Sequence, residues 1–458
     1  METWYAIIAA AKKMADLKRD GVHDEFSVAI KEDACVERDV TPPPYQVFAD
    51  GKQAKVFATA NCDFVQLEAD APVEVTVEMP GIQTAAIRPS RLERAFHISE
   101  TGLSFTAQCG DYLSVELNGN LERPLFVYVD RPIAVPDEAG MQVIKYEGDT
   151  VHDIGATKLS DNTIVYLGHN TVVRGKFFAD NAQNIKIIGH GVIDATTERT
   201  ATMFVQCKNI HMDGVCCVGY YGWNNKWFCV DGGSAANFKV MSTGVTSDGI
   251  DLLGSSNITL KHLFVRNEDD CVCLKTKKKQ TGYSICAGPV ENIVVDGCVF
   301  WCGERGNGLE IGYENDEFPV RNVVFKNVDV IHRHRAAHTF RRAAISIHCA
   351  GSGEVSNITY DNVYVESTRE NFIYISHVIA PDWGNSGGVI ENITLKNITL
   401  AGGSDAPSYI FSDTGGKKLP IRGIVFENLT YKGKAIKSKE DAKACGFVID
   451  DEAEVTFC

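Results

Sequence analysis

One short pattern returns along most of the chain and limits what the chain can fold into. Each copy opens with Asn, or once with Gly, and continues with alternating apolar residues. Copies start at residues 184, 209, 237, 257, 292, 322, 357, 392 and 423, so the pattern returns every 20 to 35 residues. Such a period is typical of a solenoid. Each unit holds short strands of period two and no helical period, which predicts a stacked β-helix rather than a helical repeat.

Asparagine at a fixed place in each coil has a structural explanation, because Asn accepts tight turns and bonds to its own backbone. Stacked coils also align such residues into ladders. We therefore interpret the five Asn-x-Thr sequences, at Asn257, Asn357, Asn392, Asn397 and Asn428, as turns. The shortest spacing, 20, is taken as close to one bare coil. Longer intervals are predicted to carry loops that wall a groove, notably 277–289 and 332–343.

The chain divides into three predicted regions. Residues 1–34 contain a short Ala- and Lys-rich helical segment. Residues 35–145 show alternating strands and turns without the repeat, which predicts a small β-sandwich-like domain. Residues 146–458 form the β-helix and are expected to end in a hairpin.

Composition excludes several partners. A net charge of -15 argues against nucleic acid or an anionic membrane as partner. No run of 18 apolar residues predicts a membrane span. The first apolar run follows Glu2 and stops at Lys12, unlike a signal peptide, so we expect a cytoplasmic protein, or a secreted one if a leader has been removed.

The 15 cysteines are odd in number and irregularly spaced, which favours reduced, buried thiols. Cys271 and Cys273 lack a second pair at zinc-site spacing. We therefore expect no metal and no other cofactor.

Three carboxylates stand out within the repeat. Asp248 and Asp269 are 21 residues apart, about one coil, and Asp270 follows directly. Residues one coil apart stack at roughly 4.8 Å, and carboxylates so close repel one another, so one keeps its proton near neutrality. Glycoside hydrolysis needs such a protonated acid beside an ionised base. A solvated turn, a structural ladder or a set of calcium ligands remain alternatives from spacing alone.

The surrounding motifs resemble glycoside hydrolase family 28, the polygalacturonase group. The similar segments are "SDGID" at 247–251, "NEDDCV" at 267–272 and "GHGVIDA" at 189–195. The resemblance implies an all-β, right-handed parallel β-helix and an inverting hydrolase. It implies that Asp269 is the general acid, that Asp248 and Asp270 activate water, and that Asp251 supports them. Family 49, the dextranases, is the next closest resemblance and usually carries an N-terminal β-sandwich.

Two departures from that family concern substrate binding. Asn307 stands where the family has His, and Glu310 adds a carboxylate three residues later. Ser346 and His348 replace the Arg-x-Lys pair that grips a uronate, which favours a neutral sugar with His348 as a hydrogen-bond partner. The alternatives are a solvated Glu310 and a structural His348.

Two other clusters have competing interpretations. Arg333, Arg335, Arg341 and Arg342 can replace the lost cations, or belong to a solvated loop or a contact between subunits of a homo-oligomer. Trp223 and, less favourably, Trp227 are candidates for stacking on sugar rings, or plain packing residues.

The resulting hypothesis is an inverting glycoside hydrolase that cleaves α-linked poly- or oligosaccharides and is not a typical polygalacturonase. A polysaccharide lyase or epimerase on the same fold, and a non-catalytic glycan-binding solenoid, are the alternatives.

Overall fold

The structure is a computed structural model that describes residues 41–136, 138–276, 279–280, 285–333, 342–378, 387–412 and 418–458. The predicted helical segment 1–34 lies outside these residues, as do Arg335 and Arg341. No helix of the described part is long and apolar enough to cross a membrane. The cysteines in that part are free thiols and most are buried, as predicted.

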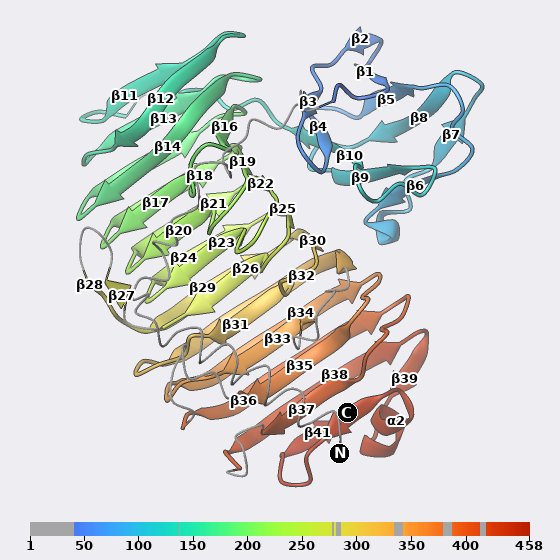
Figure 1. The fold of residues 1–458 in the computed structure, drawn as a ribbon, viewed down its shortest axis with the longest axis vertical. Coiled ribbons are helices and arrows are strands. Elements are labelled where there is room, and N and C mark those ends of the chain that lie inside the picture. The colour runs from blue at the N-terminus through green and yellow to red at the C-terminus, as the bar shows by residue number, and fades with distance from the viewer. Residues whose placement is uncertain are drawn as a thin grey trace, which may run out of the picture. The chain divides into compact units, whose positions relative to one another are not determined.

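The first described strands form two five-stranded sheets (Figure 1). One has the order β2-β1-β5-β8-β7 and the other β3-β4-β10-β9-β6. Their bounds are β1 Gln46–Ala49, β2 Lys52–Gln53, β3 Phe57–Ala58, β4 Asp63–Glu68, β5 Val73–Glu78, β6 Ala85–Arg88, β7 Phe96–Ile98, β8 Gly102–Ala107, β9 Tyr112–Leu117 and β10 Leu125–Asp130, with a 3-10 turn η3 at Ser90–Leu92. Alternate residues of both sheets, such as Val75 and Val115, share one apolar core.

The rest of the described chain is the predicted β-helix, in which successive coils pair strand on strand in parallel, while β39 pairs antiparallel with β38. Its first strand, β11, begins at Gln142, slightly before the predicted start at 146. The early strands are β11 Gln142–Tyr146, β12 Val151–Lys158, β13 Thr163–Leu167, β14 Val172–Asp180, β15 Gln183–Ile188, β16 Val192–Ala195, β17 Thr202–Val205, β18 Lys208–Asp213, β19 Cys216–Gly219, β20 Asn225–Phe228, β21 Asp231–Ala236, β22 Lys239–Ser242, β23 Ile250–Leu253, β24 Ser256–Lys261, β25 Phe264–Asn267 and β26 Val272–Lys275.

The later strands are β29 Val290–Asp296, β30 Val299–Cys302, β31 Leu309–Tyr313, β32 Val320–Arg333, β33 Ala343–Cys349, β34 Glu354–Val365, β35 Asn371–His377, β36 Val389–Leu400, β37 Ser408–Ser412, β38 Ile421–Tyr431, β39 Lys434–Ile436, β40 Phe447–Ile449 and β41 Val455–Phe457. The helix α2 spans Lys439–Ala444. A two-stranded hairpin, β27 Lys279–Gln280 with β28 Ile285–Cys286, lies in one predicted loop. The expected final hairpin is wrong: β40 and β41 pair in parallel with β37 and β38 and continue the coils.

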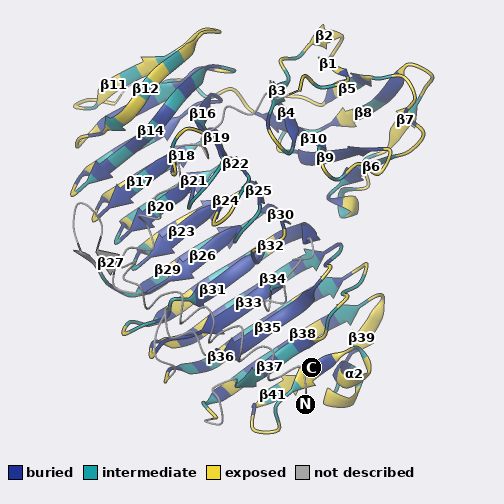
Figure 2. Ribbon diagram, viewed as in Figure 1, coloured by how far each residue is buried: buried dark blue, intermediate teal, exposed yellow. Residues whose placement is uncertain are grey.

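The interior of the β-helix consists of columns of stacked apolar side chains, and each coil contributes one side chain to each column. In one column Ile258, Ile293 and Val323 are register partners and all are buried. Figure 2 shows the buried residues running along the solenoid. Gly233 takes the same column's place one coil earlier, where an added Cβ would lie 2.2 Å from the Ile210 carbonyl oxygen.

The asparagines form two ladders, not one. All of those at copy starts have positive φ, and Asn292 Nδ2 donates to Asn257 Oδ1 at 2.9 Å in the first ladder. Asn237 was grouped with that series, but it bonds Asp213 and His262 at the other turn of the coil. The first ladder's place is taken by Gly232, which has φ 80. The spacing of 20 therefore mixed two rows, because Gly and Asn both tolerate this backbone conformation.

The sandwich packs on the β-helix through an aromatic cluster. Phe126 and Tyr128 contact Phe264, with ring centroids 4.7 and 5.1 Å apart, and Phe126 also contacts Trp301. Lys239, fully buried, forms an ion pair with Asp130 of the sandwich. These contacts attach the sandwich beside the coils that carry the three aspartates.

Candidate active site

The candidate site lies on the outward-facing side of one sheet of the β-helix, formed by β20, β23, β26, β31 and β33. Register pairing lines up Lys226, Asp251, Cys273, Glu310 and Ser346 in one row across these strands. Their neighbours along each strand face the apolar interior, as period-two alternation requires. A row of polar residues, almost all buried, therefore crosses the centre of the sheet.

Asp248 and Asp270 stand one coil apart, whereas the spacing of 21 residues predicted this for Asp248 and Asp269. Ile250 pairs with Val272, and the Gly249 amide donates to the Asp270 carbonyl at 2.8 Å. Asp270, rather than Asp269, is thus the stacked partner of Asp248. Their carboxylate oxygens and Cys273 Sγ all lie within 4.8 Å of one another, and both aspartates are buried.

Asp269 and Asp270 precede β26 in a bend, where strand alternation does not force them to opposite sides. The Cys302 thiol donates to the Asp269 carbonyl at 3.3 Å, and Asn267 Nδ2 donates to the Asp270 carbonyl at 2.6 Å. The next coil approaches closely, since a Cβ on Gly306 would lie 1.8 Å from the Asp269 carbonyl carbon. These contacts fix the backbone of both aspartates.

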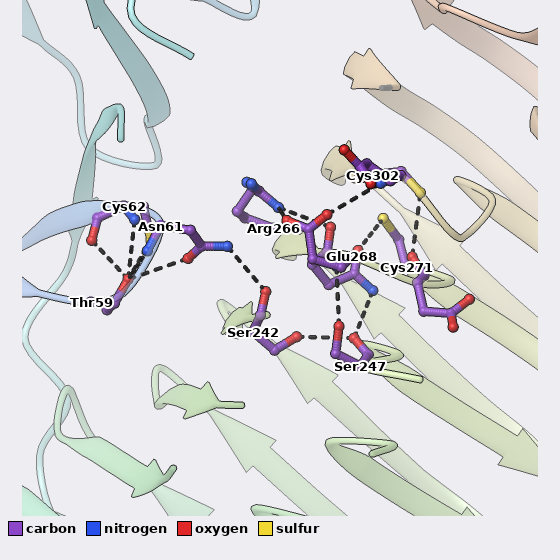
Figure 3. Close-up of polar contacts among 12 residues, drawn as sticks. Thr59, Asn61, Cys62, Ser242, Ser247, Arg266, Glu268, Cys271 and Cys302 are labelled. Atoms are coloured by element: carbon purple, nitrogen blue, oxygen red, sulfur yellow. Dashed lines mark hydrogen bonds and ion pairs between the residues drawn. The ribbon is translucent and has the colours of Figure 1, made fainter. Parts of the chain in front are cut away.

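A polar network continues from this bend to the sandwich (Figure 3). Asn267 Nδ2 also donates to the Ser247 carbonyl at 3.2 Å, and Ser242 Oγ donates to the same carbonyl at 3.0 Å. Asn61 of the sandwich donates to the Ser242 carbonyl at 3.4 Å. The sandwich therefore helps to hold the segment that precedes Asp248.

Lys275 is a central residue that the sequence analysis missed. Its ammonium donates to Asp248 Oδ2 at 3.0 Å and to Asp251 Oδ1 at 2.6 Å. Burial disfavours its charge, but the two carboxylates outweigh this and hold the pKa of Lys275 well above its usual value. A lysine inside the apolar run "CVCLKT" was the available signal, because a buried lysine needs partners.

Trp223 and Trp227 differ in their surroundings. Trp227 is fully buried in the interior, so its proposed stacking role is wrong. Trp223 is 8% exposed and its ring lies 3.6 Å from the Lys275 ammonium, a cation–π contact. Stacking of a sugar on Trp223 remains a prediction, limited by the lysine on its face.

Asn307 holds Asp270 in place. Its backbone amide and its Nδ2 donate to Asp270 Oδ1 at 2.7 and 2.8 Å, and its Oδ1 accepts from the Ala343 amide at 2.8 Å. Asn307 is fully buried. These contacts give Asn307 a positioning role toward Asp270, and its contact with substrate stays a prediction.

Glu310, Ser346 and His348 form one buried cluster. Ser346 Oγ donates to Glu310 Oε2, and His348 Nδ1 lies 2.9 Å from Glu310 Oε1. All three are fully buried, which overturns the alternative of a solvated Glu310. Tyr313 stacks on the His348 ring at 4.3 Å.

Two arginines of the basic segment fall within the described residues. Arg333 is buried and donates to the Gly306 carbonyl at 3.0 Å, so it supports the bend. Arg342 lies 5.4 Å from the Tyr313 ring. Burial opposes its charge, but Tyr313 and the carboxylates of Asp269, Asp270 and Glu310 raise the pKa of Arg342, so its charge belongs to the site.

The electrostatics match acid–base chemistry. Burial, followed by the charge of Asp270, raises the pKa of Asp269 to about 7, and the Asp269 side chain is partly exposed. Burial raises the pKa of Asp248, and the charge of Asp251 adds to this, whereas Lys275 lowers it. Burial also raises the pKa of Asp251, which Lys275 lowers. The pKa of Glu310 is raised by burial and by Asp270. Carboxylates that differ in exposure and proton affinity can divide into an acid and a base.

The same atoms raise the question of a metal. Asp248, Asp270 and Cys273 form a group with ligand-like spacing in the described part of the chain. The Lys275 ammonium, 3.0 Å from Asp248, already places a positive charge there. The donor set therefore gives no need for a metal ion.

Comparison with known proteins agrees with this geometry. Residues 103–446 match the family model described as "Glycosyl hydrolases family 28". "Probable endopolygalacturonase D" of Neosartorya fischeri is 30% identical over 195 residues, 41% of this chain and 35% of that protein. "Polygalacturonase QRT2" of Arabidopsis thaliana is 24% identical over 309 residues, 60% of this chain and 64% of that protein. The chain thus spans between a third and two thirds of these relatives.

Solved structures confirm the architecture. Dex49A from Penicillium minioluteum has a TM-score of 0.59 at 13% identity and covers 91% of this chain and 95% of its own. A polygalacturonase from Erwinia carotovora has a TM-score of 0.52 at 17% identity and covers 69% of this chain and 89% of its own. These likenesses concern the fold alone, whereas the family match covers most of the sequence. The chain belongs to glycosyl hydrolases family 28.

Proposed function

We propose that the chain is an inverting hydrolase of α-glycosidic bonds in a poly- or oligosaccharide. Asp269 donates its proton to the glycosidic oxygen as the bond from the anomeric carbon to that oxygen breaks. Asp248 and Asp270 accept a proton from the water that forms the new bond on the opposite face of the sugar. The observation that carries the proposal is the contrast between the buried Asp248–Asp270 pair and the partly exposed Asp269, whose pKa is about 7.

Supporting residues fit these roles. Lys275 keeps Asp248 oriented by the 3.0 Å contact, and Asn307 gives Asp270 Oδ1 two hydrogen bonds. These contacts involve Asp248 Oδ2 and Asp270 Oδ1, and Asp270 Oδ2 lies 3.5 Å from the Cys273 thiol. Asp251 contributes through Lys275, which it contacts at 2.6 Å, and is a positioning residue.

The substrate is proposed to differ from that of the polygalacturonase relatives. Ser346 and His348 occupy the positions where the resemblance to the polygalacturonases implies the Arg-x-Lys pair that binds a uronate. Both contact the buried carboxylate of Glu310. This cluster contains no lysine or arginine that could bind a uronate carboxylate. A neutral sugar at this position fits better.

The test is a screen of purified protein against α-linked oligosaccharides, neutral and acidic, with detection of new reducing ends. We expect turnover, loss of turnover in Asp269→Asn, and a first product of inverted anomeric configuration by NMR. Ultraviolet-absorbing unsaturated products would indicate a lyase and overturn the proposal. Binding without products would indicate the non-catalytic alternative and would do the same.

A further inference from the structure

The three aspartates of the candidate site are held in different ways. Asn307 donates two hydrogen bonds to the carboxylate of Asp270, and Lys275 donates one to the carboxylate of Asp248. Within the described residues, the carboxylate of Asp269 forms no hydrogen bond and no ion pair. The orientation of Asp269 therefore depends on the contacts that fix the backbone around it.

Glu268, the residue before Asp269, bridges two consecutive coils through its side chain. Its Oε1 accepts a hydrogen bond from the Arg266 guanidinium at 2.8 Å, and its Oε2 accepts one from the Glu304 amide at 3.2 Å. Figure 3 shows Arg266 and Glu268 side by side. Glu304 lies in the connection 303–308, which leads from β30 to β31. The Glu268 carboxylate therefore ties its own coil to the connection of the next coil.

The backbone of Glu268 is also bonded on both sides. Its amide donates to Ser247 Oγ at 3.2 Å, and its carbonyl accepts from the Arg305 amide at 2.8 Å. The carboxylate lies against the connection 303–308, because a Cβ on Gly303 would lie 2.1 Å from Glu268 Oε2. Side chain and backbone thus fix residue 268 directly before Asp269.

Arg266 connects this bridge to the sandwich. It is buried, and its Nη1 also donates to the Asn267 carbonyl at 3.0 Å. Its guanidinium lies 5.3 Å from the ring of Trp301, its register partner on β30. The Trp301 ring packs on Phe126 of the sandwich at 5.9 Å. A buried guanidinium is costly without a partner, so Arg266 stays in place because Glu268 neutralises it.

We propose that Glu268, held by Arg266, is a positioning residue that sets the orientation of the Asp269 carboxylate. The inference rests on the proposed function, in which Asp269 donates a proton to the glycosidic oxygen, and it deepens that function by assigning how the acid is held. The pair acts through the backbone of the bend and does not need to touch the sugar. A displacement of a catalytic group by about 1 Å can lower a rate about 100-fold, so the bridge has a direct consequence for turnover.

The first test needs no substrate and uses the full chain. Glu268→Gln keeps the shape of the side chain but accepts only one of the two hydrogen bonds, and Arg266→Met removes the guanidinium. Hydrogen–deuterium exchange with mass spectrometry should show roughly tenfold faster exchange of residues 267–271 in both variants. The matched control is Glu291→Gln, which alters another glutamate–arginine pair, with Arg321 at 2.8 Å on another sheet. It should leave exchange of 267–271 unchanged, and unchanged exchange in Glu268→Gln would overturn the inference.

Titration of Asp269 separates a positioning role from a simple charge effect. Carbon-13 NMR of the aspartate carboxyls, with Asp269 assigned by its absence in Asp269→Asn, measures the pKa, which burial raises to about 7 in the unmodified chain. A loosened bend exposes the carboxylate to water, so its pKa should fall by about one pH unit in both variants. Charge alone predicts opposite shifts, since loss of the Glu268 charge lowers the pKa and loss of the Arg266 charge raises it. A rise in Arg266→Met would therefore overturn the inference.

Kinetics then connect the bridge to catalysis. On an oligosaccharide that the screen shows to be hydrolysed, Glu268→Gln and Arg266→Met should each lower kcat about tenfold, while KM changes by less than about twofold. Arg266→Lys, which keeps the charge, should retain more activity than Arg266→Met, and Glu291→Gln should retain all of it. Faster exchange with unchanged kcat would mean a structural pair only and would overturn the inference. If the screen finds no hydrolysis, the proposed function fails, whereas exchange and titration still decide whether the bridge holds Asp269.

Discussion

Two buried lysines, Lys239 and Lys275, have similar surroundings but different roles, one at the contact with the sandwich and one in the candidate site. Lys239 pairs with Asp130 and lies 4.8 Å from the Tyr112 ring where the sandwich meets the β-helix. Lys275 pairs with Asp248 and Asp251 and lies 3.6 Å from the Trp223 ring. Burial and an aromatic neighbour are common to both, so neither feature identifies a site.

The charge balance differs between the two places. Asp130 has Lys239 for one oxygen, and its other oxygen accepts from the Tyr112 hydroxyl at 2.6 Å. Lys275 is divided between two carboxylates, and Asp270 lies within 4.8 Å of Asp248. Each charge is matched at the interface, whereas carboxylates outnumber the two cations, Lys275 and Arg342, at the site. The excess retains protons, and retained protons are what acid catalysis requires.

The largest expected effect comes from removing one of the excess carboxylates, Asp269. Asp269→Asn should lower kcat about 1000-fold, because the amide cannot donate the proton to the leaving oxygen. Chain folding should be preserved, since the substitution keeps the shape of the side chain. Steady-state kinetics and a thermal melt measure both, and a variant that retains more than a tenth of the activity would contradict the role.

Lys275→Met tests the shared cation. Breaking a buried ion pair costs about 3–5 kcal/mol, and activity should be lost because Asp248 is no longer oriented. The stability loss should be smaller at pH 5 than at pH 8, because the orphaned aspartates are then protonated. Denaturant unfolding at the two pH values measures the difference, and an equal loss at both would argue against it.

Lys239→Met is the matched variant at the interface. We expect a destabilisation of about 3 kcal/mol for the same reason, with kcat nearly unchanged in the folded fraction. Kinetics normalised to folded protein provide the measurement. A fall in kcat comparable to that of Lys275→Met would erase the distinction between the two lysines.

The pH profile is the most graded effect. Asp269 must be protonated to act, and its pKa is raised to about 7, so kcat should fall about tenfold per unit at pH values well above 7. Arg342 lowers that pKa, so Arg342→Met should move the alkaline limb to higher pH. The Lys326→Gln variant, which alters a lysine of β32 that pairs with Asp296, is the control. Its pH profile should overlay that of the unmodified chain.

The same raised pKa affects stability with a definite sign. A carboxyl group that binds its proton more tightly when folded stabilises the fold while protonated and loses that contribution as pH rises through its folded pKa. The stability of Asp269→Asn relative to the unmodified chain should therefore rise between about pH 4, near the unfolded pKa, and about pH 7, the folded pKa, and stay constant above that. Thermal melts of both proteins across that range measure the difference in stability, and a difference that does not change with pH would contradict the prediction.

The sequence predicted the β-helix and placed Asp248 about one coil before the Asp269–Asp270 pair, because each strand of a parallel β-helix stacks on the strand one coil earlier. It did not predict that Asp270, rather than Asp269, is the stacked partner. The sequence analysis missed Lys275, because a single lysine in an apolar strand does not show which residues it pairs with. Asn237 was assigned to the wrong asparagine ladder because the turn position of that coil is occupied by Gly232, which adopts the same positive φ but is not an asparagine. The buried Glu310 cluster depends on what covers the sheet, which a local pattern does not contain.

The connection from β26 to the next strand of its sheet has a broader consequence. Ile250 pairs with Val272 after a short coil, and Val272 pairs with Leu309 after a much longer one that includes the β27–β28 hairpin. The added segment leaves strand alignment intact on both sides. A connection of this kind can therefore change in length while the strands that carry the aspartates keep their register.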